Sequence, residues 1–147
     1  MKEIPSLAFW LGWAGVIPFA ALAALVVAGG SASLDAASAL RALAAYGVII
    51  LSFMGGAQWG LETARRDGDG SGFLASVVPA LIAFAVTFID PAVALPILAA
   101  SFILLLIYDL RRVRAGTGPA WYGRLRIQLT SAVVLSLLAA TGAVFRT

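Results

Sequence analysis

Five long apolar stretches alternate along the chain with short segments rich in small and charged residues. The stretches cover residues 7–28, 40–61, 73–89, 92–110 and 125–145. A membrane span needs roughly 20 predominantly apolar residues, with a range of about 17–25, and all five stretches fall within it. Because a backbone in lipid must form its hydrogen bonds with itself, stretches of this length predict helices. The pattern therefore predicts an all-α membrane protein, a five-helix transmembrane bundle.

The segments between the stretches add detail to this prediction. Gly29 and Gly30 end the first stretch, and the pair Asp90-Pro91 forms a tight turn between the third and the fourth. Such a short turn predicts that these two helices form an antiparallel hairpin. The first stretch is longer than the core of a signal peptide, which is about 7–15 residues. It is expected to be a retained span, and residues 1–147 are expected to form one membrane domain.

Positive charges predict how the bundle is oriented. With five spans, the N-terminus and the second and fourth linkers lie on one side of the membrane. That side holds eight of the ten cationic residues, and the other holds Arg41 and Arg146; the eight are Lys2, Arg65, Arg66, Arg111, Arg112, Arg114, Arg124 and Arg126. Because lysine and arginine are enriched in cytoplasmic loops, we expect a cytoplasmic N-terminus and an external C-terminus. The expected location is the bacterial inner membrane.

Composition agrees with a membrane protein and excludes several other classes. The chain is 62% hydrophobic and 12% charged, whereas soluble domains have roughly half apolar and about a quarter charged residues. The isoelectric point near 10 at first suggests a nucleic-acid partner, but the net charge is only +3. Because orientation already accounts for the arginines, no nucleic-acid partner is expected. The expected partners are the lipid bilayer and either further copies of the chain or a larger membrane protein.

Candidate chemistry is narrow because the chain has no cysteine and no histidine. This excludes disulfides, iron–sulfur clusters and sites in which cysteine or histidine holds zinc, copper or haem. It also excludes a cysteine nucleophile and any triad with histidine as the base. Seven carboxylates remain for acid–base or metal chemistry. We expect no metal, no cofactor and no enzymatic activity.

The stretch SFMGGAQWGLETARR, residues 52–66, combines small, polar and basic residues at the end of the second apolar stretch. Residues spaced by four lie on one stripe of a helix, and small residues on such a stripe let a second helix approach closely. The predicted packing stripe comprises Ser52, Gly56 and Gly60 with Gly55 beside it, and Gly12 and Gly15 offer a similar face in the first helix. Arg65 and Arg66 are expected to anchor the cytoplasmic end.

Polar residues also gather at the depth of this stretch. Candidates for a polar cluster at the cytoplasmic mouth are Gln58, Glu62, Asp109, Arg126, Gln128 and Thr130. Glu62, Asp109 and Arg126 are expected to meet there, with the arginine held by fork geometry and charge-assisted bonds. In the alternative, each side chain reaches the headgroups independently. The aromatic residues expected at the membrane interface are Trp59, Tyr108, Trp121 and Tyr122.

Several motifs, taken in order, resemble one known family. They are LGWAGVIPF, YGVIILSFMGGAQWG, a proline-led third helix, an aspartate closing the fourth, and PAWYGRLRIQLT. Nearly the whole chain resembles domain-of-unknown-function family 3429, the family related to transmembrane protein 69. The resemblance implies a small multi-pass membrane protein and brings no activity with it.

Three functions remain open from the residues. The preferred one is a non-catalytic accessory, assembly or scaffold protein, since the chain is small and its loops are thin. The alternative is a small oligomeric channel or carrier for a small solute, with Gln58 and Glu62 at its inner mouth. The third is an intramembrane enzyme using Glu62 or Asp109 as acid or base. The absence of charge from the middle of the last three apolar stretches argues against proton or sodium coupling.

Overall fold

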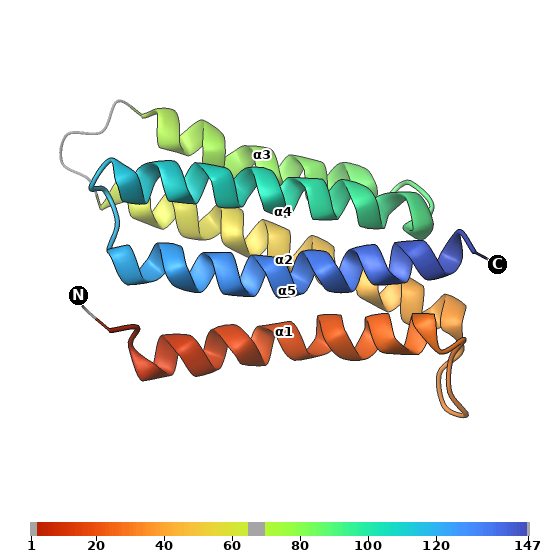
Figure 1. Ribbon diagram of the computed structural model, residues 1–147. Coiled ribbons are helices and arrows are strands. Elements are labelled where there is room, and N and C mark those ends of the chain that lie inside the picture. The colour runs from red at the N-terminus through yellow and green to blue at the C-terminus, as the bar shows by residue number, and fades with distance from the viewer. Residues whose placement is uncertain (1–2, 65–69, 147) are drawn as a thin grey trace.

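The computed structural model describes residues 3–64 and 70–146, and every regular element in this part of the chain is an α-helix. The helices are α1 (Ser6–Val27), α2 (Ala36–Thr63), α3 (Ser71–Val86), α4 (Pro91–Arg114) and α5 (Ala120–Val144). They lie side by side as a layered bundle, with α1 and α5 neighbouring one another and α3 on the far side of α2 (Figure 1). The predicted all-helical architecture is confirmed.

Several helices extend beyond the apolar stretches that predicted them. Helix α2 begins at Ala36 rather than at residue 40, because the carboxylate of Asp35 caps it by accepting the Ser38 N–H at 2.9 Å. Helix α4 continues through three arginines to Arg114, and α5 already begins at Ala120. Caps and turn residues, not the loss of apolar character, determine where a helix ends. A prediction based on hydropathy alone therefore shortens helices whose ends are polar.

Helix α3 is shorter than predicted. It has 16 residues and ends at Val86, so residues 87–89 of the predicted third span are not helical. The N–H groups of Thr87, Phe88 and Ile89 bond to carbonyls three residues earlier, which tightens the chain into a turn. At about 1.5 Å per residue, α3 is roughly 24 Å long, against roughly 30 Å for a hydrocarbon core. Among the described residues, four helices, α1, α2, α4 and α5, are long and apolar enough to cross a membrane.

The hairpin predicted at Asp90-Pro91 is present. Helices α3 and α4 run in opposite directions (Figure 1). Asp90 caps α4 by accepting the Ala92 N–H at 2.8 Å, and Pro91 occupies the first turn, where its missing N–H costs nothing. Even so, α3 packs mainly along α2 and touches α4 less.

Apolar side chains between α1, α2, α4 and α5 form the core. The largest completely buried ones are Phe19, Phe102, Leu43, Leu51, Leu95, Leu98 and Leu137. The Phe19 ring packs edge-on against Tyr46 and Phe102, with centroids 4.8 and 6.0 Å away. Helices α2 and α4 each pack against three other described helices.

The outer surface of the bundle is also apolar. On α3 alone, Leu74, Leu81 and Phe84 are 61–74% exposed, and many large apolar side chains on the other helices are also exposed. Soluble monomers rarely leave apolar patches of this extent uncovered. A molecule that is apolar both inside and outside is suited to lipid as its solvent.

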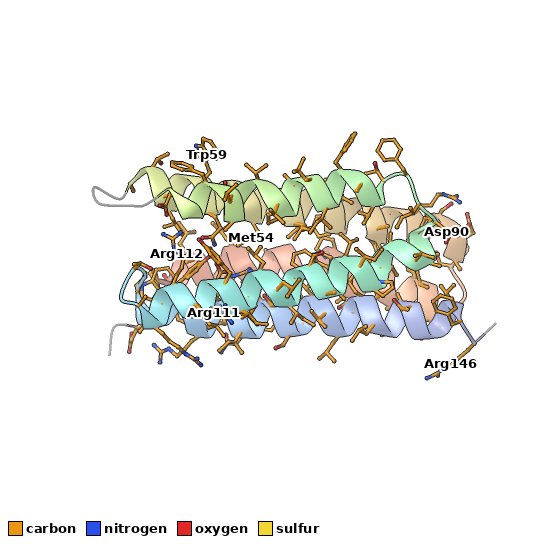
Figure 2. The ribbon with its side chains drawn as sticks, turned by 90° about the horizontal axis from the view of Figure 1, so that it is seen from above. Met54, Trp59, Asp90, Arg111, Arg112 and Arg146 are labelled. Carbon is orange, nitrogen blue, oxygen red and sulfur yellow. The ribbon has the colours of Figure 1, made fainter. Side chains whose placement is uncertain are left out.

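The two ends of the bundle differ in charge. The N-terminus, the end of α2, the start of α3 and the α4–α5 connection lie at one end, and the C-terminus lies at the other (Figure 1). Arg111 and Arg112 lie at the first end, which we call the basic end, whereas Asp90 and Arg146 lie at the second (Figure 2). Lys2, Arg65 and Arg66, which were part of the orientation argument and of the predicted anchor, lie outside the described residues.

Candidate functional site

Polar side chains are buried between the helices at the basic end. Gln58 and Glu62 come from α2, Asp109 from α4, and Arg126 and Thr130 from α5, and each is at most 6% exposed. Burying a charge is costly unless it is paired and hydrogen-bonded. The partners of these groups therefore decide what the site is.

Asp109 is the centre of the site because both of its oxygens are occupied. Gln58 Nε2 donates to Asp109 Oδ1, and Arg126 Nε donates to Asp109 Oδ2 at 2.6 Å. This carboxylate thus connects α2, α4 and α5. Arg126 does not form the predicted fork, because its Nη1 lies 3.6 Å from Met54 Sδ and its Nη2 has no partner among the described residues.

Glu62 is paired with a different arginine from the one predicted. Arg112 Nη1 lies 3.2 Å from Glu62 Oε2, and the Arg112 side chain is only 12% exposed. The same nitrogen donates to the Tyr108 hydroxyl at 3.3 Å, and the guanidinium lies 5.7 Å from the centre of that ring. The structure therefore has two ion pairs here, Glu62 with Arg112 and Asp109 with Arg126. The predicted single group of Glu62, Asp109 and Arg126 is not formed. We call Gln58, Glu62, Asp109, Arg112 and Arg126 the polar cluster.

The rotation of α5 separates two residues that were predicted to act together. Thr130 lies one turn after Arg126 and is 2% exposed, so it faces the same interior. Gln128 lies on the exposed side of the helix and does not belong to the cluster. The prediction for Gln128 is wrong because a residue two positions from Arg126 lies on nearly the opposite face of a helix.

The predicted interface aromatics lie around the cluster. Trp59 is 49% exposed and its ring packs on Phe73, with centroids 4.6 Å apart. The rings of Trp121 and Tyr122 meet edge-on at 6.2 Å. Both residues line a pocket of about 170 Å³ that also reaches Gln58, Asp109 and Arg112.

The glycines of α2 behave differently from the predicted stripe. A Cβ at Gly55 would lie 2.5 Å from the carbonyl oxygen of Ser76, so α3 approaches α2 at this glycine. At Gly56 and Gly60 a Cβ would meet nothing within 4 Å, and both positions are exposed. Gly55 is therefore the contact residue. Ser52 is half-buried.

The glycines of α1 also depart from the prediction of a close helix contact. A Cβ at Gly12 would meet only the end of the Leu129 side chain, at 2.7 Å, and a Cβ at Gly15 would meet nothing within 4 Å. The carbonyl of Gly15 accepts a hydrogen bond from the Tyr46 hydroxyl at 2.9 Å. This face of α1 borders a cavity rather than the backbone of another helix.

Three residues that make contacts in the polar cluster or between helices were not identified from the sequence: Arg112, Met54 and Gly47. Only Arg112 could have been found from the sequence pattern. Arg112 follows Asp109 by three positions, which places both on one face of α4. Met54 and Gly47 carried no such signal, although a Cβ at Gly47 would lie 2.9 Å from Leu98 Cδ1. Across residues 3–64 and 70–146, no three carboxylates gather to hold a metal ion.

Comparisons with known proteins agree with the architecture. The family model described as "Protein of unknown function (DUF3429)" matches residues 4–142. A protein of Xenopus tropicalis called Transmembrane protein 69 is 36% identical over 143 residues. The match covers 94% of this chain and 54% of that relative, so the chain spans about half the relative's length. No solved structure matches the chain significantly.

Proposed function

The chain belongs to the DUF3429 family of membrane proteins, and from that premise we propose that it is a non-catalytic multi-pass protein. Its proposed role is that of an accessory, assembly or scaffold component in a larger membrane complex. The proposed location is the bacterial inner membrane.

The observation that carries this proposal is the pairwise compensation of the buried charges. Asp109 is bound by Arg126 and Glu62 by Arg112, with N–O distances of 2.6 and 3.2 Å. The two pairs are electrically neutral together, and Gln58 joins the first pair to α2. Such a cluster fixes the packing of three helices, which is what a scaffold requires.

The same geometry argues against an acid–base role for Asp109. A general acid or base must reach the proton it transfers within hydrogen-bonding distance. Both oxygens of Asp109 already accept hydrogen bonds from neighbouring helices, and the residue is 1% exposed. A substrate would have to displace Gln58 or Arg126 to engage this carboxylate.

We also propose five spans, with the basic end on the cytoplasmic side. Although α3 is short, its outer face carries Leu74, Leu81 and Phe84 in exposed positions, and Phe88 in the following turn is exposed too; lipid is the solvent that such a surface requires. The turn at residues 87–89 lengthens the third apolar segment beyond the end of α3, before α4 begins. Arginines are enriched on the cytoplasmic side of membrane proteins. The arginines of α4 and α5 lie at the basic end together with the N-terminus (Figure 1), so the proposed N-terminus is cytoplasmic.

The accessory role is tested by gentle native extraction. The chain, tagged at its C-terminus and expressed at its natural level, is isolated in mild detergent and read out as particle mass and partner identities. We expect a stoichiometric complex with a larger membrane protein. Arg126→Ala, which leaves Asp109 buried without its arginine, should reduce the amount of this complex, whereas Gly56→Ala on the exposed face of α2 should not.

A homo-oligomer without a partner would contradict the accessory role. It would support the alternative of a small channel or carrier. Liposomes containing the protein would then be compared with empty liposomes for leakage of protons, ions and small neutral solutes. Equal leakage would remove that alternative too.

A further inference from the structure

A second cavity, apart from the pocket beside Trp121 and Tyr122, is lined by Arg126. It has a volume of about 140 Å³ and lies between α1, α2 and α5, with Phe102 of α4 also in its wall. Its walls are almost entirely apolar, and the residues that matter here are Gly12, Gly15, Phe53, Met54, Arg126 and Thr130. No function proposed above uses this cavity.

Two residues that line the cavity each carry a buried donor atom without a partner in the described part of the chain. The atoms are Arg126 Nη2 and Thr130 Oγ1, on residues that are 6% and 2% exposed. Buried polar groups without partners are rare, and each one calls for an explanation. The two residues lie one turn apart on α5, so their side chains leave the same side of the helix.

Thr130 differs from other buried or half-buried hydroxyls of these helices. Ser101, Ser136 and Thr141 each donate to the carbonyl four residues earlier, at 2.8 Å. This is the usual way in which a hydroxyl is satisfied inside a helix. Thr130 does not make that bond, and its hydroxyl has no partner among the described residues although Thr130 lines the cavity.

The cavity exists because α1 carries glycine where it faces α2 and α5. A Cβ at Gly15 would meet nothing within 4 Å, so the space beside it is unfilled. A cavity of about 150 Å³ holds a benzene ring, which is close to the volume here. Leu11 and Phe53, which also line the cavity, are 64% and 69% exposed, so the cavity opens between α1 and α2 toward lipid.

The charge around the cavity determines which hydrogen-bond acceptor a ligand can bring into it. Arg126 is already neutralised by Asp109, so a carboxylate or phosphate in the cavity would add an uncompensated buried charge, which is costly. A neutral carbonyl accepts hydrogen bonds without adding charge. We propose that this cavity binds the carbonyl-bearing end of a neutral, membrane-soluble molecule, whose tail leaves between Leu11 and Phe53.

Two sources supply such a carbonyl: a quinone ring and the ester of a neutral glycerolipid. The probes are decylubiquinone and dioctanoylglycerol, and decanoate serves as the charged comparison. Each is titrated against the purified full chain in phosphatidylcholine nanodiscs, and the Kd is taken from the rise of the thermal unfolding midpoint. We expect saturable binding of at least one neutral probe and none of decanoate, and the neutral probe that binds identifies the source.

Gly15→Leu is the decisive variant because Gly15 lines the cavity and a Cβ there would meet nothing within 4 Å, so the added side chain occupies the cavity. It should weaken binding at least tenfold, whereas Gly56→Leu, which also enters open space but outside the cavity, should leave the Kd unchanged. If neither neutral probe binds, or if Gly15→Leu binds as well as the wild type, the proposal is overturned. Tighter binding of decanoate would overturn the assignment to a neutral carbonyl.

Thr130→Val separates a ligand-binding role from a structural one. It removes an unsatisfied hydroxyl with almost no change in shape. It should therefore raise the unfolding midpoint of the ligand-free protein while weakening probe binding about fivefold, as the loss of one hydrogen bond implies. Lowered stability with unchanged binding would contradict the proposal.

Discussion

Asp109 is the residue on which the polar contacts of three helices converge. It is 1% exposed and accepts hydrogen bonds from Gln58 and Arg126. A buried ion pair is weak evidence of net stability, because desolvation offsets much of the attraction. Breaking it by removing one partner is nevertheless severe, because the other charge stays buried. The distinction is measurable with single and double variants.

Asp109→Leu should lower the free energy of unfolding by about 3–5 kcal/mol, since Arg126 remains buried without its carboxylate. In Asp109→Leu/Arg126→Met both charges are replaced by apolar side chains, and most of that loss should be recovered. The measurement is reversible unfolding in mixed micelles, with all variants at one detergent composition. If the double variant loses as much free energy of unfolding as the two single variants combined, the cost does not come from leaving one buried charge unpaired.

The carboxylate of Asp35 has a different role at the start of α2. Its pKa is lowered because it accepts the Ser38 backbone N–H and the Ser38 hydroxyl, at 2.9 and 2.8 Å. A lowered pKa means that the cap is complete above the usual value of 3.8 and is lost as pH falls through the folded value. Asparagine caps helices about as well as aspartate and does not titrate.

Thermal unfolding as a function of pH therefore tests the cap. The wild type should exceed Asp35→Ala at neutral pH, and this difference should shrink as pH falls below 3.8. The difference between Asp35→Asn and Asp35→Ala should persist at low pH, because the amide keeps its acceptor. If the unfolding temperatures of all three proteins change with pH in the same way, the ionised carboxylate of Asp35 does not stabilise the fold.

Helix α3 comes close to the backbone of α2 at one glycine, Gly55. At Gly55 a methyl group would lie 2.5 Å from the Ser76 carbonyl oxygen, whereas at the adjacent Gly56 it would meet nothing within 4 Å. Gly56 is therefore a matched control for Gly55, because the two glycines are adjacent in one helix and only Gly55 is in close contact with α3. The contact is to backbone, which cannot rotate away as a side chain can.

Gly55→Ala should lower the free energy of unfolding by about 1–3 kcal/mol, the usual cost of overpacking. Gly56→Ala should be neutral or slightly stabilising, since alanine is favoured over glycine in a helix interior by roughly 0.5–1 kcal/mol. Unfolding in micelles measures both. Equal effects would show that α2 and α3 do not meet at Gly55.

The number of spans determines which connections share a side of the membrane. With five spans, Ser33 before α2 and Thr117 before α5 lie on opposite sides; if α3 did not cross, they would lie on the same side. The chain has no cysteine, so a single introduced cysteine is the sole thiol. Both positions are exposed.

Ser33→Cys should react with an impermeant maleimide added to intact spheroplasts, and Thr117→Cys should react only after the membrane is opened. Detergent-solubilised protein gives the full labelling level as the control. If both cysteines react from the outside, α3 does not span. If the pattern is reversed, the basic end faces outward.

Much of the architecture was predictable because it depends on local properties. Apolar stretches of span length predict helices wherever the chain lies in lipid, and Asp90-Pro91 predicts the hairpin of α3 and α4. The helix ends were less predictable, since Asp35 and Pro119 extend α2 and α5 into polar segments. The polar candidates of α2 and α4, Gln58, Glu62 and Asp109, were identified from their depth in these helices.

The pairing within the site was not predictable, because it depends on how each helix is rotated about its own axis. Where a helix is apolar on every face, its hydrophobic pattern carries little information about that rotation. Sequence by itself determined that this chain is a helical membrane protein and which polar residues share a depth. Only the tertiary structure decided that Gly55 contacts α3, that Gln128 faces outward, and that Glu62 pairs with Arg112, because packing between helices selects the rotation.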